Sequence, residues 1–147
     1  MPVLRHVADK LLQLQRAGLV IPGETEDGDE VFLVEQIGTT VLVTAYGHTA
    51  EFAGISKIVF DAGTGNDTVL IAPSVTAAVE GRGGDGNDNL QGGSGPNKLW
   101  GDAGSDVLSG RAAADSLVGG DGDDFLYGYG GADTLDGGNG DDAIYGE

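Results

Sequence analysis

Cysteine is absent from the 147 residues of the chain, and proline, histidine and tryptophan are rare, with 4, 2 and 1 residues. Without cysteine the chain has no disulfide framework, no thiolate metal site and no cysteine nucleophile. Basic residues are also few, because 7 Lys and Arg stand against 24 Asp and Glu, and the formal net charge is −17. This charge has the wrong sign for binding nucleic-acid phosphates or an anionic membrane surface. We therefore expect metal ions or polycations as partners, and no nucleic acid.

Long apolar segments and catalytic motifs are missing as well. No apolar run approaches the ~18 residues of a membrane span, so we expect no membrane insertion. Arg5, Asp9 and Lys10 interrupt the place where a cleavable secretory signal has its apolar stretch. The two histidines, His6 and His48, do not have the HExxH spacing of a metalloprotease, and the chain contains no GxSxG and no phosphate loop with a lysine. The sequence predicts a protein that is not an enzyme.

Glycine, by contrast, is abundant and concentrated, because residues 83–147 hold 19 of the 28 glycines. Residues 83–145 divide without any insertion into consecutive nine-residue units, a period that indicates a repeat architecture. The units read GGDGNDNLQ, GGSGPNKLW, GDAGSDVLS, GRAAADSLV, GGDGDDFLY, GYGGADTLD and GGNGDDAIY. Upstream, residues 62–70 (AGTGNDTVL) match the same pattern, and residues 72–80 keep only the apolar Val79 at the eighth place.

These units resemble the RTX (repeats-in-toxin) nonapeptide G-G-x-G-x-D-x-U-x, in which U is a large aliphatic residue. Three units, 83–91, 119–127 and 137–145, satisfy every fixed position. The resemblance implies an all-β fold, a right-handed parallel β-roll or β-helix solenoid, in which two consecutive units form one coil and several Ca²⁺ ions bind between the turns. The alternative is a disordered Gly/Asp-rich linker, which is also the state expected without calcium.

The residue types of one unit fit this interpretation. Glycine at positions one, two and four permits positive φ in a tight turn, and the aspartate at position six supplies a carboxylate. Hard oxygen ligands of this kind suit Ca²⁺, whereas Zn²⁺ prefers His or Cys. Positions seven to nine form a short strand whose middle side chain points inward. The predicted inward residues are Leu90, Leu99, Leu108, Leu117, Leu126, Leu135 and Ile144.

A coil of two units places the sixth positions on two edges of the solenoid. Edge 1 carries Asp88, Asp106, Asp124 and Asp142, and it also receives Asp67 if residues 72–80 form a degenerate half-coil. Edge 2 carries Asn97, Asp115 and Asp133. Edge 1 is intact, whereas on edge 2 Asn97 lacks a carboxylate, which weakens the interval between Asn97 and Asp115 as a calcium site.

The resemblance also implies the ligands of each calcium, two aspartates and backbone carbonyls from the first four positions of two turns. On edge 1 these carbonyls belong to Gly83, Gly84, Asp85, Gly86, Gly101, Asp102, Ala103, Gly104, Gly119, Gly120, Asp121, Gly122, Gly137, Gly138, Asn139 and Gly140. The acidic side chains at positions two, three and five are expected to face water. Residues 83–147 have a net charge of −11, from 13 acidic and 2 basic residues, so metal binding should be coupled to folding.

Three segments are expected along the chain. Residues 1–23 hold an amphipathic capping helix that ends near Gly18, because apolar residues recur there at helical spacing. Residues 24–82 form irregular β-solenoid coils, and residues 83–147 form the calcium-binding β-roll. Strands are predicted at 31–34, 40–46 and 55–60 from their β-branched and aromatic content.

The charge distribution suggests how such a chain is used. Residues 1–23 have a net charge of +2 and the rest of the chain −19, which favours head-to-tail contact between copies and growth into filaments or a surface matrix. The resemblance implies a secreted or cell-surface protein, exported by type I secretion without a cleaved N-terminal signal. The alternative function is a calcium-folding and secretion module of a larger exoprotein such as a toxin, protease or lipase.

Overall fold

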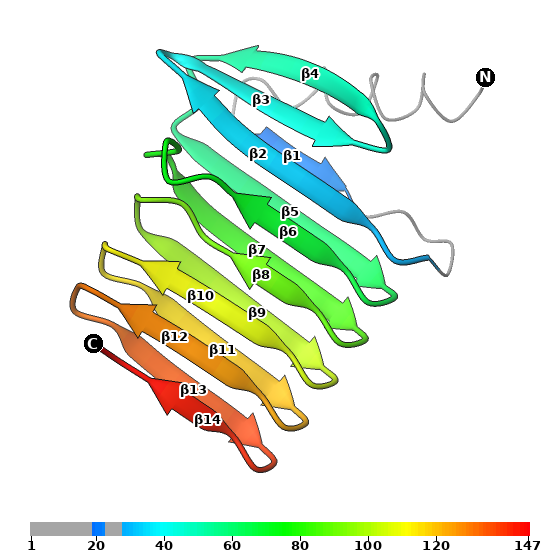
Figure 1. The fold of residues 1–147 in the computed structure, drawn as a ribbon, viewed down its shortest axis with the longest axis vertical. Coiled ribbons are helices and arrows are strands. Elements are labelled where there is room, and N and C mark those ends of the chain that lie inside the picture. Colours follow the sequence, from blue (N-terminus) through cyan, green and yellow to red (C-terminus); the bar gives the residue numbers. More distant parts are fainter. Residues whose placement is uncertain (1–18, 23–27) are drawn as a thin grey trace.

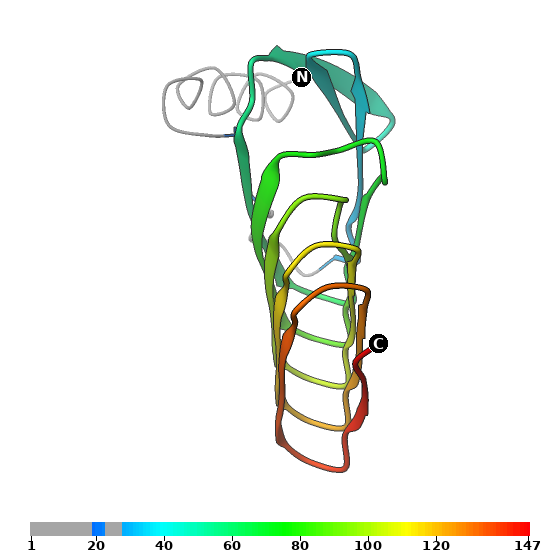
Figure 2. The ribbon, with the colours of Figure 1, turned by 90° about the vertical axis from the view of Figure 1, so that its left-hand side faces the viewer.

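The computed structural model describes residues 19–22 and 28–147. The helix expected before Gly18 lies outside these residues. The described part of the chain is all-β, and its strands form two sheets that face each other across a narrow core (Figures 1 and 2). Most neighbouring strands within each sheet are parallel. No helix in this part has the length and apolarity required to cross a bilayer.

The chain alternates between the two sheets from β5 onward. The first sheet contains, in spatial order, β1 (Leu19–Pro22), β5 (Lys57–Thr64), β7 (Ala78–Asp85), β9 (Asn97–Ala103), β11 (Ser116–Asp121) and β13 (Thr134–Asn139). The second sheet contains β14 (Ala143–Tyr145), β12 (Phe125–Tyr129), β10 (Val107–Arg111), β8 (Asn89–Gln91), β6 (Thr68–Ile71), β2 (Val31–Ile37), β3 (Thr40–Ala45) and β4 (His48–Ala53). This alternation is a parallel β-solenoid and confirms the predicted fold.

Strand register follows the nonapeptide period. Leu108 pairs with Leu90 on one side and with Leu126 on the other, and each partner lies two repeat units away in the chain. Between β6 and β8 the offset is longer, because Thr68 pairs with Asn89. The first sheet has the same longer offset, because Lys57 pairs with Ala78. Within the degenerate half-coil, Val79 pairs with Asn97 and Gly81 with Leu99, so Gly81 and not Val79 has the eighth place.

The core is a single column of aliphatic side chains between the sheets. Five of the predicted inward residues have no exposed surface, namely Leu90, Leu99, Leu108, Leu117 and Leu126. The upstream coils continue the column with Ile58, Val69, Ile71 and Val75. Ile144 is 47% exposed, because β14 pairs with β12 alone. The inward direction of the eighth position therefore gives full burial only where a coil is stacked on both sides.

Residues 31–53 depart from the coil pattern. Strands β2, β3 and β4 form an antiparallel meander that extends the second sheet, and only β2 also pairs in parallel, with β6. Val34, Val41 and Phe52 are buried beneath this meander. The meander covers the N-terminal end of the aliphatic column with antiparallel strands (Figure 1).

Candidate metal centre

The aspartates of edge 1 occupy equivalent places in successive coils. Each lies in the turn that leads from the first sheet to the second, directly before a strand of the second sheet. Asp67, Asp88, Asp106 and Asp124 are all buried, and Asp106 has no exposed surface. The turns stack on one side of the solenoid, at the right-hand ends of the strands in Figure 1. The structure thus brings the five predicted edge 1 aspartates into one column.

A ladder of hydrogen bonds connects this column. In each pair, the Oδ1 atom of one aspartate accepts the backbone N–H of the residue aligned with it in the preceding coil. The pairs are Glu30 N–H to Asp67 at 2.7 Å, Asp67 to Asp88 at 2.7 Å, Asp88 to Asp106 at 2.7 Å, Asp106 to Asp124 at 2.7 Å and Asp124 to Asp142 at 3.0 Å. One carboxylate oxygen of each aspartate is therefore committed to joining coils.

The second oxygen of these aspartates is left without a hydrogen-bond partner. The Oδ2 atoms of Asp67, Asp88, Asp106 and Asp124 are buried and accept nothing from the protein. A buried charged oxygen without a partner is costly, because burial removes its hydration. These atoms need a cation or a proton to compensate that cost.

The first glycine of each repeat has no side chain, and this leaves space for the carboxylate of the aspartate. A methyl group at Gly83 would lie 2.2 Å from Asp88 Oδ2 and 2.8 Å from the carbonyl oxygen of Gly101 in the next coil. The same arrangement recurs at Gly101 with Asp106 and at Gly119 with Asp124. Each Oδ2 atom thus shares its surroundings with a backbone carbonyl of the following coil, and both are hard oxygen donors.

Glycines at the second and fourth positions let successive turns stack closely. Gly104 has φ of +130°, and a methyl group there would lie 1.9 Å from the carbonyl oxygen of Gly86. Gly122 repeats this geometry above Gly104. The third-position carbonyls are already used between coils, since Ala103 accepts the N–H of Gly86 at 2.8 Å. The stacked turns therefore line the column with backbone carbonyls.

A second polar ladder runs beside the aspartates, at the fifth position of the repeat. Here each side-chain oxygen accepts the backbone N–H of the aligned residue in the following coil. The edge 1 aspartates, by contrast, accept from the preceding coil. The pairs are Asn66 N–H to Asp29, Asn87 to Asn66, Ser105 to Asn87, Asp123 to Ser105 and Asp141 to Asp123, at 2.8 to 3.3 Å. The acidic side chains at this position are exposed, in line with the expectation that they face water.

Burial controls the acidity of the aspartate column. Desolvation is the largest cause and raises the pKa of Asp88 to about 6 and that of Asp106 to about 6. The same cause raises the pKa of Asp115 and Asp124. Neighbouring carboxylates raise it further, and the backbone hydrogen bonds oppose the shift. In the absence of cations, the raised pKa values favour protonation of these aspartates and so lower the negative charge of the column.

Edge 2 contains a shorter column. The N–H of Asp115 donates to Asp133 Oδ1 at 2.9 Å, and the N–H of Asn97 donates to Asp115 Oδ1 at 2.8 Å. Asp115 Oδ2 is buried without a hydrogen-bond partner, as on edge 1. The interval between Asp115 and Asp133 therefore has the same chemical character as the edge 1 intervals.

Two acidic residues make contacts that the nonapeptide pattern does not predict. Glu30 is buried and aligned with Asp67 across the β2 and β6 pairing, so it extends edge 1 by one coil. No repeat motif surrounds Glu30, and only the strand pairing reveals its place. The side chain of Asp102, in turn, forms an ion pair with Arg82 at 2.6 Å, and Arg82 also lies over the ring of Trp100 at 5.0 Å.

The described residues contain no point around which three or more His, Asp or Glu side chains gather. An ion on either edge must therefore be held by one or two carboxylates together with backbone carbonyls. Ca²⁺ accepts this mixture in flexible geometry, with six to eight oxygen ligands. The unpartnered Oδ2 atoms and the carbonyl-lined turns fit Ca²⁺, whereas Zn²⁺ prefers the nitrogen or sulfur donors of His or Cys.

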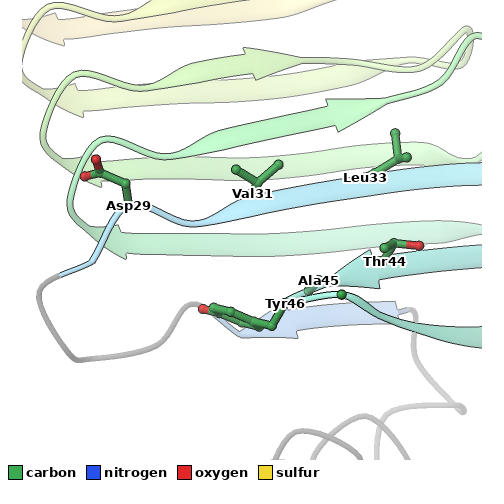
Figure 3. Close-up of a pocket in the computed structure, with 7 residues that line it drawn as sticks. Asp29, Val31, Leu33, Thr44, Ala45 and Tyr46 are labelled. Atoms are coloured by element: carbon green, nitrogen blue, oxygen red, sulfur yellow. The ribbon is translucent and has the colours of Figure 1, made fainter.

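A groove of about 450 Å³ lies elsewhere, on the outer face of β2 and β3 (Figure 3). Val31, Leu33 and Tyr46 contribute its apolar lining, and Asp29 is the one carboxylate there among the described residues. Asp29 Oδ1 accepts the N–H of Asn66 at the N-terminal end of the fifth-position ladder. The groove is thus mainly apolar and separate from the carbonyl-lined turns.

The fold and the turns define a class of protein, a parallel β-solenoid with stacked, oxygen-lined turns along its edges. Residues 82–117 and 109–144 match the family described as the RTX calcium-binding nonapeptide repeat, in a form with four copies. The matched residues, 82–144, make up less than half of the chain, and over them the sequence is similar to RTX calcium-binding repeats. A search of curated proteins and a search of solved structures each gave no significant match.

Proposed function

We propose that this protein is a structural module whose coils fold when calcium binds along edge 1 and between Asp115 and Asp133. The buried, unpartnered Oδ2 atoms carry the proposal, because each marks a place where the fold lacks a positive charge. Each calcium is expected to take oxygens from two successive aspartates and from the carbonyls of the first four repeat positions. Bound calcium would offset the desolvation of the carboxylates, so binding and folding are one process.

A calcium titration of the chelated protein, followed by circular dichroism, tests this proposal. The double variant D106A/D124A removes two carboxylates from edge 1, and we expect the calcium midpoint of folding to rise by at least about tenfold. The matched control is D61A/D136A, which removes the same charge from exposed strand positions. An equal midpoint in the two variants would contradict the site assignment.

The proposed place of action is outside the cell, after type I secretion without a cleaved N-terminal signal. The repeats support this, since extracellular calcium modules bind at roughly 10⁻⁴ to 10⁻³ M and would stay unfolded in a cytosol with little calcium. A folding midpoint in that range is the expected result. A midpoint below about 10⁻⁶ M would contradict the proposal, because the chain would then fold before export.

Self-assembly into filaments or a surface matrix is the proposed use of the folded coils. Its support is the edge formed by β13 and β14, each of which pairs on one side only, next to the exposed Ile144 and Tyr145. Unpaired strands of this kind offer hydrogen-bonding groups to another chain. Sedimentation during return of millimolar calcium should give large, chelator-reversible particles. A compact monomer would instead favour a calcium-folding module of a larger exoprotein.

A further inference from the structure

Asn97 on edge 2 has surroundings that differ from those of every edge 1 aspartate. Its side chain is buried, and its amide nitrogen Nδ2 donates to oxygens on two successive turns. The acceptors are the carbonyls of Gly93 at 3.3 Å, Gly95 at 2.9 Å and Gly110 at 2.9 Å, and Asp115 Oδ1 at 2.9 Å. Four oxygens thus surround one nitrogen that carries two hydrogens, which it must share among them.

These four oxygens have the repeat positions expected for calcium ligands. Gly93 and Gly95 are the second and fourth residues of their unit, Gly110 is the first residue of the next unit on this edge, and Asp115 is its aspartate. On edge 1 the residue equivalent to Asn97 is an aspartate such as Asp88, whose Oδ2 is buried without a partner. The amide nitrogen supplies positive hydrogens where the edge 1 turns have only oxygen.

Arg111 provides a second substitute for a cation between the same two turns. It stands at the second position of its unit, where a typical unit has glycine, and it keeps the glycine-like φ of +102°. Its Nε atom donates to the carbonyl of Gly92 at 2.7 Å. A permanent positive charge therefore lies beside a carbonyl that belongs to the adjoining turn.

We infer that Asn97 and Arg111 together take the place of a calcium ion between the turns 92–97 and 110–115, so that this interval is complete without metal. The inference rests on the proposed calcium-dependent folding of the other intervals. It makes this part of edge 2 a calcium-independent clamp that joins two coils before any ion binds. It also identifies Asn97 as the residue that sets how many ions the chain binds.

Equilibrium dialysis with calcium, which counts ions per chain, tests the inference on the full chain. N97D restores the aspartate of the repeat, and we expect it to bind one ion more than the wild type and to require more calcium for folding. N87D is the matched control, because it makes the same change at an exposed fifth position on edge 1. N87D should leave the ion count unchanged.

N97A covers the case in which N97D does not fold. The inference predicts an unchanged ion count for N97A with lower stability in saturating calcium, because the carbonyls lose their donor. One ion fewer in N97A would overturn the inference, as would a folded N97D with the wild-type count. A wild-type chain that binds no calcium would contradict the proposed function itself, which is a different result from either of these.

Discussion

Asp106 accepts the backbone N–H of Asp88 through Oδ1 at 2.7 Å, while its other oxygen, Oδ2, is buried without a hydrogen-bond partner. The two oxygens of one carboxylate thus have separate tasks. Oδ1 joins two coils through a hydrogen bond to the backbone, and Oδ2 holds a charge that the protein alone does not compensate. The same division recurs along edge 1, so coil stacking and the proposed calcium binding depend on the same side chains.

Two variants of Asp106 distinguish the role of the Oδ1 hydrogen bond from the role of the charge. D106N keeps an oxygen acceptor for the Asp88 N–H but removes the charge, whereas D106A removes both. Both should need more calcium to fold. In saturating calcium, urea unfolding should show D106A to be less stable than D106N by about 1–3 kcal/mol, because the Asp88 N–H is left buried and unsatisfied. Equal stabilities of the two variants would contradict the proposed task of Oδ1.

The close stacking of turns predicts a strong effect of G104A. Gly104 has φ of +130°, and an added methyl group would lie 1.9 Å from the Gly86 carbonyl oxygen. We expect G104A to lose at least about 2 kcal/mol of unfolding free energy in calcium. G130A is the matched control, since Gly130 has no atom within 4 Å of the added methyl group. Urea denaturation of both variants in millimolar calcium measures the difference.

The aliphatic column predicts the cost of a cavity. Leu108 has no exposed surface and lies between Leu90 and Leu126. L108A should destabilise the calcium-loaded protein by about 2–5 kcal/mol, as buried leucine truncations do. K98A, on the exposed outer side of β9, should change stability by less than about 0.5 kcal/mol. Comparable losses in both variants would contradict the proposed position of the core.

The raised pKa values of Asp88 and Asp106 predict that a fall in pH favours folding without calcium and opposes it with calcium. Because the pKa of Asp88 and Asp106 is about 6 in the fold and near 3.8 when unfolded, the fold binds more protons than the unfolded chain between these values. In chelator these groups therefore favour folding as pH falls from 7 to about 4. Circular dichroism in chelator should show β-structure increasing over that range.

With calcium present the same protonation opposes folding, because protons and calcium compete for the carboxylates. The calcium midpoint should therefore rise as pH falls from 7 to 5. A midpoint that does not change over this range would show that the buried carboxylates do not bind the ion.

The repeat pattern predicted the coils well, because its spacing fixes both strand pairing and burial. Leu90, Leu99 and Leu117 lie where the eighth position placed them, and the aspartates of edge 1 form the expected column. The period determines these positions, since a coil of two units leaves each side chain one permitted place in the stack.

Outside the repeats the sequence was less informative. Glu30 reaches edge 1 because β2 pairs with β6, a strand far along the chain, and no local motif encodes that pairing. The antiparallel pairing of β3 and β4 was not predicted either, because strand propensity does not specify direction. For Asn97 the sequence showed the lost carboxylate, but its four hydrogen bonds depend on the positions of two folded turns.

The constant register of the coils has a consequence for how such chains change in length. Residues 101–118 form one coil, and Gly119 has the same repeat position as Gly101. Deleting or duplicating this coil would bring equivalent repeat positions together and alter the length of the solenoid by one step of about 4.8 Å. Each coil contacts only its neighbours, so the remaining turns would keep their geometry. Duplication by whole coils is thus a change that this architecture tolerates, and the coil between Asp67 and Asp88 accommodates three further residues while both aspartates stay in the column.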